Sequence, residues 1–330
     1  MLDSRFNLVR FPLITLIITV TLSIGLVSCG SSEDIPIQQV DHMDRLSDVE
    51  LRQQEQFNES QDSQFIFNFG FDLRASPQED AAQYLPFLTY LEKATGYRFK
   101  LHFTSKNSST VDDIGQGKTQ FAAMGADGFL KAQSEHGALS LVRGVNHQGK
   151  TEYQSILVVR PDSLIENVKD IKEHSLAFGS RDSTQGHLIP RIILMDNGIS
   201  LNDLKDYGYT GSHQNCAEAV VSGKYDVCGM QDQLAKKLAS QGVVKIIHTS
   251  RYYPSSGIVA NKSVPAEIIK RIKRALIDFD PEGKHREGLY HWDSTEMPKG
   301  FLAANEGDYN DLRQWSIRFG FLKESLTQDQ

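Results

Sequence analysis

The sequence is poor in the residues that build metal centres and nucleic-acid surfaces. Its three cysteines and ten histidines are scattered, with no Cys-x-x-Cys or His-x-x-x-His pair, so we expect neither a metal ion nor a cofactor. The formal net charge is −7, and the lack of a basic stripe argues against binding to DNA or RNA. We find no internal repeat at the period of about 20–50 residues that is typical of solenoid proteins.

Long apolar runs are also missing, except for one at the N-terminus. Two arginines precede an apolar stretch from Pro12 to Val27, which is short for a membrane-spanning helix of about 20 residues. The stretch ends at Leu26-Val27-Ser28-Cys29, a lipobox pattern in which the cysteine is lipidated and becomes the mature N-terminus. We therefore expect residues 1–28 to be a lipoprotein signal peptide and Cys29 to anchor the protein. The alternative is an ordinary signal peptide, or an uncleaved anchor, with an incidental cysteine.

Only two other cysteines remain, Cys216 and Cys228. They could pair in an oxidising compartment. From the sequence we favour two buried thiols, one on a helix and one on a strand.

Most of the negative charge lies between the lipobox and the folded part. Residues 29–64 contain nine acidic and two basic residues and few aromatic ones. Such a segment buries too little apolar surface to offset its loss of chain entropy, so we expect a flexible tether. Because the leader carries +1, residues 65–330 keep a net charge of only −1. The acidity therefore does not indicate a binding surface.

From Phe65 onward, the hydrophobic pattern alternates between strands and helices, which is typical of α/β folds. The first half predicts strands at 65–70, 98–103 and 120–124, and helices at 77–94, 111–117 and 129–134. The second half predicts strands at 175–179, 225–230 and 243–249, and helices at 184–195, 216–222 and 233–240. A return strand at 256–260 and helices at 266–279 and 309–319 follow. Crossings near 153–160 and 250–260 indicate two lobes joined by a two-strand hinge, with a ligand between them.

The most informative segment is Phe178-Gly179-Ser180-Arg181-Asp182-Ser183-Thr184-Gln185-Gly186-His187, where a strand gives way to a helix. The first amides of a helix have no partner inside the helix and carry the positive end of its dipole. They form an anion site to which hydroxyl groups add donors, although the Gly-Lys-Ser/Thr ending of a P-loop is absent. We predict that the ligand is held by Ser183, Thr184, Gln185, Gly186 and His187. The alternative is that Asp182 or Ser183 only caps the helix.

The same segment also allows a hydrolase, with Asp182, Ser183 and His187 as a triad. Ser183 and His187 are four residues apart and could share a helix face. However, the Gly-x-Ser-x-Gly elbow of the α/β-hydrolases is missing, so we do not expect an enzyme.

Four further residues follow predicted strands or open predicted helices. His213 opens a helix of the second lobe, and Asp232 follows the strand at 225–230, so both are ligand candidates that could instead be caps. In the first lobe, Asp127 and Phe129 lie in a Gly-rich turn where backbone amides could approach a ligand.

These residues also resemble the phosphonate, phosphite and phosphate-binding proteins of ABC importers. The run from Ala177 to Pro190 is similar to that family's strand-turn-helix signature, roughly Ser-Thr-Ser-Gly-His/Tyr. Further similar segments, in the same order, are Gly70 with Ser76-Pro77, Tyr84–Leu91, Ile156–Arg160, Val168–Ile171, Gly211-Ser212-His213, Ala217–Val220 and Gly223–Val227. Two departures from the family's pattern are Gln185, where Ser is frequent, and Phe129, where Tyr is common.

The resemblance implies an α/β fold of the type II periplasmic-binding-protein architecture, each lobe a mixed, mainly parallel sheet flanked by helices. We expect lobe 1 at 65–157 plus 255–330 and lobe 2 at 158–254. It further implies a monomeric binding protein, which the lipobox cysteine would anchor in the cell membrane or outer membrane, facing the periplasm or the cell exterior. Its partners would be a small oxyanion and the permease subunits of an ABC importer. The alternative is a sensor that has the same two-lobed binding fold and signals through a membrane protein.

Overall fold

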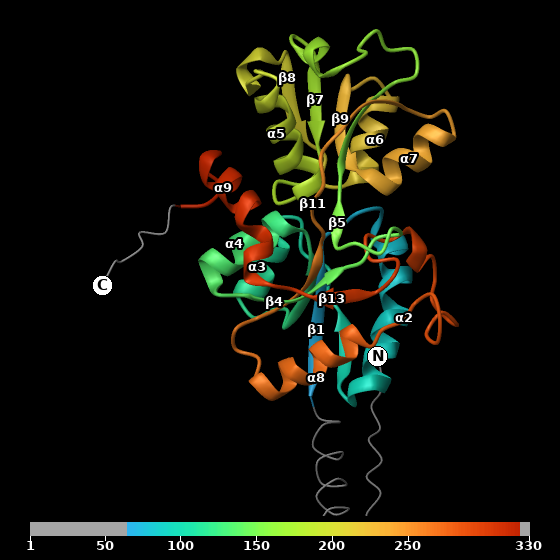
Figure 1. Ribbon diagram of the computed structural model, residues 1–330, viewed down its shortest axis with the longest axis vertical. Helices are drawn as coiled ribbons and strands as arrows, with labels where there is room; N and C mark the ends of the chain where they lie inside the picture. Colours follow the sequence, from blue (N-terminus) through green and yellow to red (C-terminus); the bar gives the residue numbers. More distant parts are fainter. Residues whose placement is uncertain (1–64, 324–330) are drawn as a thin grey trace, which may run out of the picture. The chain divides into compact units, whose positions relative to one another are not determined.

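The computed structural model describes residues 65–323, apart from the side chain of Glu306. The expected signal peptide at 1–28, the lipidated Cys29 and the tether at 29–64 lie outside these residues and stay predictions. Within 65–323, the chain forms two α/β lobes, each built on one mixed sheet with helices on both faces (Figure 1). No helix of this part of the chain is long and apolar enough to span a bilayer.

The lobe 1 sheet has six strands in the order β13-β4-β12-β3-β1-β2. Their bounds are β1 (Ile66–Phe71), β2 (Arg98–Leu101), β3 (Phe121–Met124), β4 (Leu139–Gly144), β12 (Gly257–Ala260) and β13 (Phe301–Ala303). The pairings show that β1 to β4 run in one direction, whereas β12 and β13 run in the other. The sheet is therefore mixed, with four of its strands in one direction, as the family resemblance implies.

The helices of lobe 1 lie on two faces because β3 buries alternate side chains on opposite sides. Phe121 and Ala123 belong to the core beneath α2 (Pro77–Thr95) and α8 (Ala266–Ile277). Ala122 and Met124 belong to the other core. That second core lies beneath α3 (Thr110–Gly115), α4 (Ala126–His136) and α9 (Asn310–Arg318). Because successive side chains of this short apolar strand point to opposite faces of the sheet, each face is covered by its own layer of helices.

Lobe 2 repeats this plan with five strands in the order β10-β6-β9-β7-β8. Their bounds are β6 (Ser155–Val159), β7 (Ser175–Phe178), β8 (Asp206–Tyr209), β9 (Val227–Gln231) and β10 (Lys245–Thr249). All run one way except β6, whose five residues are buried. The covering helices are α5 (Ile189–Asp196) on one face and α6 (His213–Val221) with α7 (Asp232–Ser240) on the other. Short 3-10 turns occupy Val168–Ile171, Leu201–Asp203, Trp292–Ser294 and Glu306–Tyr309.

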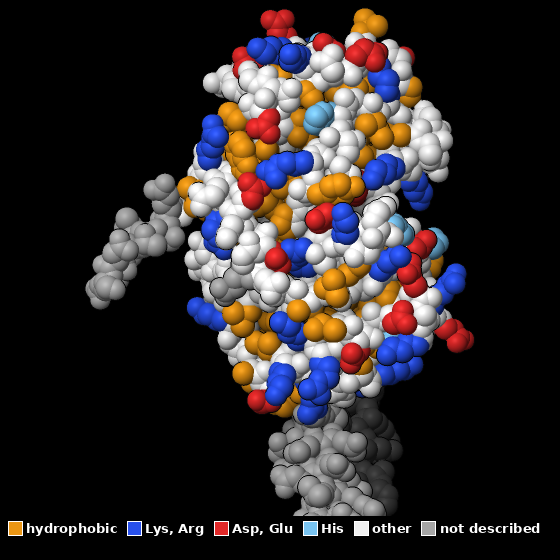
Figure 2. Space-filling view, viewed as in Figure 1, with side chains coloured by type: hydrophobic (Ala, Val, Ile, Leu, Met, Phe, Trp, Pro, Cys, Tyr) orange, Lys and Arg blue, Asp and Glu red, His pale blue; other side chains and the backbone are white. Residues whose placement is uncertain are grey.

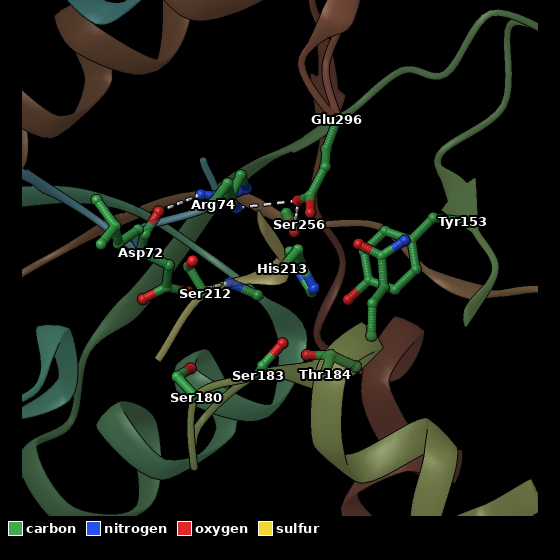
Figure 3. A pocket seen from close by; sticks show the side chains of 13 residues that line it. Asp72, Arg74, Tyr153, Ser180, Ser183, Thr184, Ser212, His213, Ser256 and Glu296 are labelled. Atoms are coloured by element: carbon green, nitrogen blue, oxygen red, sulfur yellow. Dashed lines mark hydrogen bonds and ion pairs between the residues drawn. The ribbon is translucent and has the colours of Figure 1, made fainter. Parts of the chain in front are cut away.

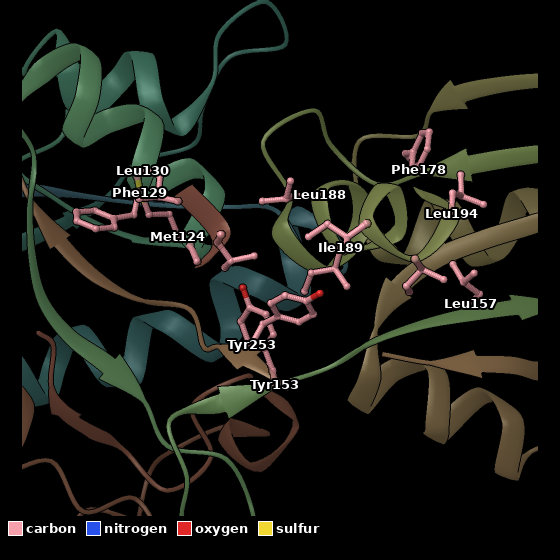
Figure 4. Close-up of a cluster of buried hydrophobic side chains, with 14 of the residues drawn as sticks. Met124, Phe129, Leu130, Tyr153, Leu157, Phe178, Leu188, Ile189, Leu194 and Tyr253 are labelled. Atoms are coloured by element: carbon pink, nitrogen blue, oxygen red, sulfur yellow. The ribbon is translucent and has the colours of Figure 1, made fainter. Parts of the chain in front are cut away.

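The chain passes between the lobes through two short strands, β5 (Glu152–Tyr153) and β11 (Tyr253–Pro254), which pair antiparallel (Figure 1). Beside them, one hydrophobic cluster contains side chains from both lobes. Figure 4 shows Met124 and Phe129 of lobe 1 in the same cluster as Leu188 of lobe 2. Apolar side chains therefore pack continuously from one lobe to the other.

The helix expected at 184–195 has two parts. Residues Thr184–Leu188 form a wide π turn, and the regular helix α5 begins only at Ile189. Pro190 has no amide to donate to the carbonyl of Gly186. That carbonyl instead accepts the amide of Gly179, at the end of β7. The proline thus fixes a wide first turn against the strand end, which is where the sequence places its anion site.

Candidate functional site

A cavity lies between the lobes, near the ends of β1, β3, β7 and β9. Its volume is about 20 Å³, enough for about one water molecule. The side chains and backbone around it come from both lobes: Asp72, Leu73, Arg74, Gly125, Tyr153, Ser180, Ser183, Thr184, Gln185, Ser212, His213, Ser256 and Glu296. Figure 3 shows Ser183 and Thr184 on one side, with Arg74 and Glu296 on the other. The position agrees with the general rule that ligands bind at strand ends in open α/β sheets.

The first turn after β7 offers two hydroxyl protons to the cavity. Ser183 is the N-cap of the π turn, and its Oγ accepts the amide of Gly186 at 2.9 Å. Thr184 Oγ1 accepts the amide of Asp127, from lobe 1, at 2.8 Å. Because both oxygens act as acceptors in these bonds, each hydroxyl keeps its own proton for a further acceptor. Both side chains line the cavity.

His213 adds a neutral N–H donor. It begins α6 directly after the N-cap Ser212, and its Nδ1 accepts the amide of Gln231 at 3.3 Å. A ring nitrogen that accepts an amide carries no proton, so in the neutral ring the proton is on Nε2. Burial lowers the pKa of His213 to about 4, more than the charge of Glu296 raises it. At neutral pH, the imidazole is therefore uncharged.

Lobe 1 contributes a buried ion pair. Arg74 Nη2 lies 2.9 Å from Glu296 Oε2, and the same carboxylate oxygen accepts the hydroxyl of Ser256. Burial opposes the ionisation of Glu296, but the charge and hydrogen bond of Arg74 outweigh it and hold its pKa below the usual range. The guanidinium also donates from Nη1 to the carbonyl of Asp72 at 2.9 Å. The two side chains thus form a fixed pair whose charges cancel.

Tyr153 and Asp72 complete the lining. The hydroxyl of Tyr153 is buried beside the Thr184 and Ser256 hydroxyls and the amide of Ala126, and burial raises the pKa of the phenol. Asp72 Oδ2 accepts the amide of Gly125 at 2.8 Å, and burial raises the pKa of this carboxyl. Asp72 therefore stabilises the start of α4, whereas Tyr153 places its hydroxyl beside the turn that carries Thr184.

The comparisons with known proteins agree with this geometry. A sequence model of the family described as ABC transporter, phosphonate, periplasmic substrate-binding protein matches residues 69–309. The chain belongs to this family. The matched range contains every residue that lines the cavity.

Two curated relatives of the family are similar in sequence. The chain is 27% identical over 215 residues to the phosphonates-binding periplasmic protein of Escherichia coli (strain K12), a match covering 62% of this chain and 63% of that protein. It is 26% identical over 265 residues to a probable ABC transporter phosphite binding protein, PhnD1, of Prochlorococcus marinus (strain MIT 9301), covering 74% and 81%. The match to the E. coli protein thus spans a little under two thirds of its length. Both are named as binding proteins, not as enzymes.

Solved structures establish the fold. PhnD1 from Prochlorococcus marinus in complex with methylphosphonate has a TM-score of 0.70 at 17% identity, covering 77% of this chain and 98% of that one. A binding protein component of an ABC phosphonate transporter from Pseudomonas aeruginosa has a TM-score of 0.69 at 21% identity, covering 78% and 87%. The predicted two-lobed type II fold is confirmed.

Among the residues singled out from the sequence of this phosphonate-binding family member, five line the cavity or pack against it. Ser183, Thr184, Gln185 and His213 line it. Gly186 lies behind them, where an added Cβ would come within 2.8 Å of Ser183 Oγ and 3.0 Å of the His213 ring. Only glycine therefore allows this close approach.

Three other ligand candidates, His187, Asp127 and Phe129, have their contacts outside the cavity lining. His187 Nδ1 contacts the carbonyl of Arg181 at 2.8 Å, and its Nε2 contacts the hydroxyl of Tyr209 at 3.1 Å. Both ring nitrogens are thus occupied outside the cavity lining. Asp127 lies 2.9 Å from Lys131, and Phe129 packs against Tyr309. We leave these three side chains out of the ligand set that we propose.

Asp232 lies just beyond the cavity lining. It begins α7, and its Oδ1 accepts Gln185 Nε2 at 3.4 Å. Burial raises the pKa of Asp232, and Lys236 acts in the opposite direction. The carboxyl therefore contacts a lining residue without lining the cavity itself.

The hydrolase alternative has no support in these contacts. Ser183 Oγ is bonded to the Gly186 amide and His187 to Arg181 and Tyr209, while Asp182 pairs with Lys131 at 2.8 Å. The three side chains therefore do not form a triad.

The structure contradicts the two buried free thiols that we favour from the sequence. Cys216 on α6 and Cys228 on β9 form a disulfide, with their Cα atoms 5.8 Å apart. The expectation of free thiols is wrong because α6 packs directly on β9 and brings together two residues whose separation of 12 positions gives no such indication. The bridge joins the helix that carries His213 to the strand that ends at Gln231.

Arg74, Glu296 and Tyr153 are lining residues that the sequence analysis missed. Arg74 and Glu296 are separated by 222 positions, so no local pattern links them. The one signal was the place of Arg74, just after the end of a predicted strand.

Proposed function

We propose that this protein is a lipid-anchored, extracytoplasmic solute-binding protein that captures a small phosphorus oxyanion for an ABC importer. The ligand class comprises phosphonates, phosphite and phosphate-like anions. The observation that carries the proposal is the convergence of the Ser183 and Thr184 hydroxyls with the His213 Nε2–H on one buried cavity between the lobes. The names of the relatives, which bind phosphonates, phosphite and methylphosphonate, support the same class.

The chemistry of the cavity favours an anion with several oxygens. Hydroxyl and imidazole N–H groups donate, and hydrogen bonds to a charged acceptor contribute about 1.5–3 kcal/mol each. The amides at the start of the turn that follows Ser183 add the positive end of a backbone dipole. On the face shown in Figure 2, acidic and basic side chains are interspersed without a broad patch of one sign. Recognition would therefore depend on the cavity and not on a charged surface.

Capture would involve closure of the lobes. The paired strands β5 and β11 are the covalent connection between the two sheets and serve as the hinge in this proposal. Closure excludes water from the cavity, which strengthens hydrogen bonds to the ligand. Small-angle scattering with saturating ligand should show a smaller radius of gyration than the unliganded protein.

The membrane anchor rests on Leu26-Val27-Ser28-Cys29, outside the described residues. Cys29→Ser should release the protein from the membrane fraction. Recovery of the variant in that fraction with a normally cleaved leader would refute the anchor without affecting the ligand proposal.

The function itself is tested by a thermal-shift panel on the full-length protein in detergent, with phosphite, methylphosphonate, phosphate and sulfate. A ligand at 100 times its Kd adds about 2.7 kcal/mol of stability. We expect a phosphorus oxyanion to give this increase and Ser183→Ala to remove it. Ser240→Ala, on an exposed serine of α7, is the matched control and should respond like the wild type. Stabilisation by none of the phosphorus oxyanions would overturn the proposal.

A further inference from the structure

One buried donor of a residue that lines the cavity has no acceptor. Arg74 Nε takes part in no hydrogen bond within residues 65–323. An unpaired buried donor carries a desolvation cost that a ligand acceptor removes. The unused hydrogen-bonding capacity of Arg74 is therefore a donor.

The two carboxylates beside Arg74 each have one oxygen that already accepts hydrogen bonds. Glu296 Oε2 receives both Arg74 Nη2 and the Ser256 hydroxyl. Asp72 Oδ2 receives the amide of Gly125. An ammonium that approached Glu296 would lie beside the like charge of the Arg74 guanidinium, 2.9 Å from the carboxylate, whereas a ligand oxygen meets the unpaired Arg74 Nε donor.

The position of Arg74 makes it a contact for the anion from lobe 1. Its guanidinium is held by Glu296 and by the carbonyl of Asp72, both of its own lobe. Figure 3 shows it across the cavity from Ser183, with His213 between them. An anion at the Ser183 turn would thus have the guanidinium donors of Arg74 opposite it, and a guanidinium suits phosphorus oxygens because of its planar set of donors.

Building on the proposed function, we propose that Arg74 is a ligand-binding and specificity-determining residue, with Glu296 as its positioning carboxylate. Arg74 donates to the oxyanion from lobe 1, and the pair selects phosphorus oxyanions that carry no ammonium group.

The test is calorimetry on the full-length protein in detergent with phosphite, methylphosphonate and 2-aminoethylphosphonate. We expect the wild type to bind the better of the first two at least tenfold more tightly than 2-aminoethylphosphonate. Arg74→Gln should weaken that binding at least tenfold, and Arg74→Lys, which keeps the charge, should weaken it less. Arg143→Gln is the matched control, because Arg143 is a buried lobe 1 arginine that pairs with Asp308 and does not line the cavity. Thermal melts establish that each variant is folded.

Glu296→Gln separates the two roles of the carboxylate. Its amide oxygen can still accept from Arg74, so binding of the simple oxyanion should be retained or become tighter as a competing negative charge is lost. A selective loss of 2-aminoethylphosphonate binding in this variant would mean that Glu296 holds an ammonium, and it would overturn the inference. Unchanged oxyanion affinity in folded Arg74→Gln would also overturn it, while leaving the proposed function intact. Failure of the wild type to bind any of the three ligands would instead overturn both.

Discussion

The hydroxyl of Thr184 in lobe 2 accepts the backbone amide of Asp127 in lobe 1 over 2.8 Å. The same hydroxyl lines the cavity and keeps its proton for a ligand. A single oxygen therefore takes part in the contact between the lobes and in the proposed contact with the anion. Loss of this oxygen should affect ligand affinity and lobe closure together.

Thr184→Val removes the hydroxyl and keeps the shape of the side chain. We expect oxyanion affinity to fall about tenfold to a hundredfold, since a hydrogen bond to a charged group contributes about 1.5–3 kcal/mol and each decade corresponds to about 1.4 kcal/mol. Thr184→Ser, which retains the hydroxyl, should stay within a few-fold of the wild type. Calorimetry measures the Kd of both variants. An unchanged Kd in Thr184→Val would mean that Thr184 has only a structural role.

Lys131 connects the lobes through charge. Its Nζ lies 2.9 Å from Asp127, which is fully buried, and 2.8 Å from the more exposed Asp182 of lobe 2. Lys131→Met leaves a buried carboxylate without its cation and should cost about 3–5 kcal/mol of unfolding free energy. Asp182→Asn removes only the partly exposed partner and should cost about 1 kcal/mol or less. Urea denaturation of both variants tests this, and equal losses would contradict it.

Stability should fall with acid below about pH 6.5. Burial lowers the pKa of both His187 and His213 to about 4, whereas an unfolded histidine titrates near 6.5. Between these values the unfolded chain binds more protons, so the unfolding free energy rises as the pH increases from 4 to 6.5. For each histidine, the unfolding free energy changes by on the order of 3 kcal/mol across this pH range, at about 1.36 kcal/mol per pKa unit. Asp80, whose pKa burial raises to about 6, acts in the opposite direction over part of this range.

The measurement is chemical denaturation across this pH range, with His213→Asn beside the wild type. The variant should show a shallower acid loss, whereas His147→Asn, on an exposed histidine, should follow the wild-type curve. Identical slopes for the wild type and His213→Asn would mean that this histidine does not fold in its neutral form.

Removing the Cys216–Cys228 disulfide should lower stability and affinity together. A bridge that closes a loop of this size stabilises by about 3 kcal/mol in the chain-entropy treatment. The double Ser variant should also bind ligand several-fold more weakly, because α6 then holds His213 less firmly against the end of β9. A reductant should lower the Tm of the wild type and leave that of the double variant unchanged. A wild-type Tm that is insensitive to reductant would argue against the bridge.

The sequence predicted the parts of the site that depend on local structure. Ser183 and Thr184 follow a strand end and open a turn, and His213 opens a helix, so each could be found from neighbouring residues. The two-lobed fold was equally accessible, because alternating strands and helices determine the layers of an α/β protein.

The parts that depend on distant segments could not be found in this way. Arg74 meets Glu296 only after β1 and the segment before β13 have joined one lobe. His187 lies on the predicted turn, yet its ring packs against Phe178, Tyr209 and Phe321 and not toward the cavity. Aromatic neighbours from other elements fix the direction of this ring, and no local pattern records them.

The order of strands in the two sheets has a consequence for synthesis. Every strand of the lobe 2 sheet comes from one uninterrupted stretch that ends at Thr249, whereas β12 fills the gap between β3 and β4 in lobe 1. A chain that emerges N-terminus first has therefore delivered all of lobe 2 while lobe 1 still has open strand edges. Such edges are templates for pairing with other chains. Lobe 1 is therefore the first lobe to begin and the last to be completed. A nascent chain that stalls before Gly257 exposes the unpaired edges of β3 and β4 to neighbouring chains.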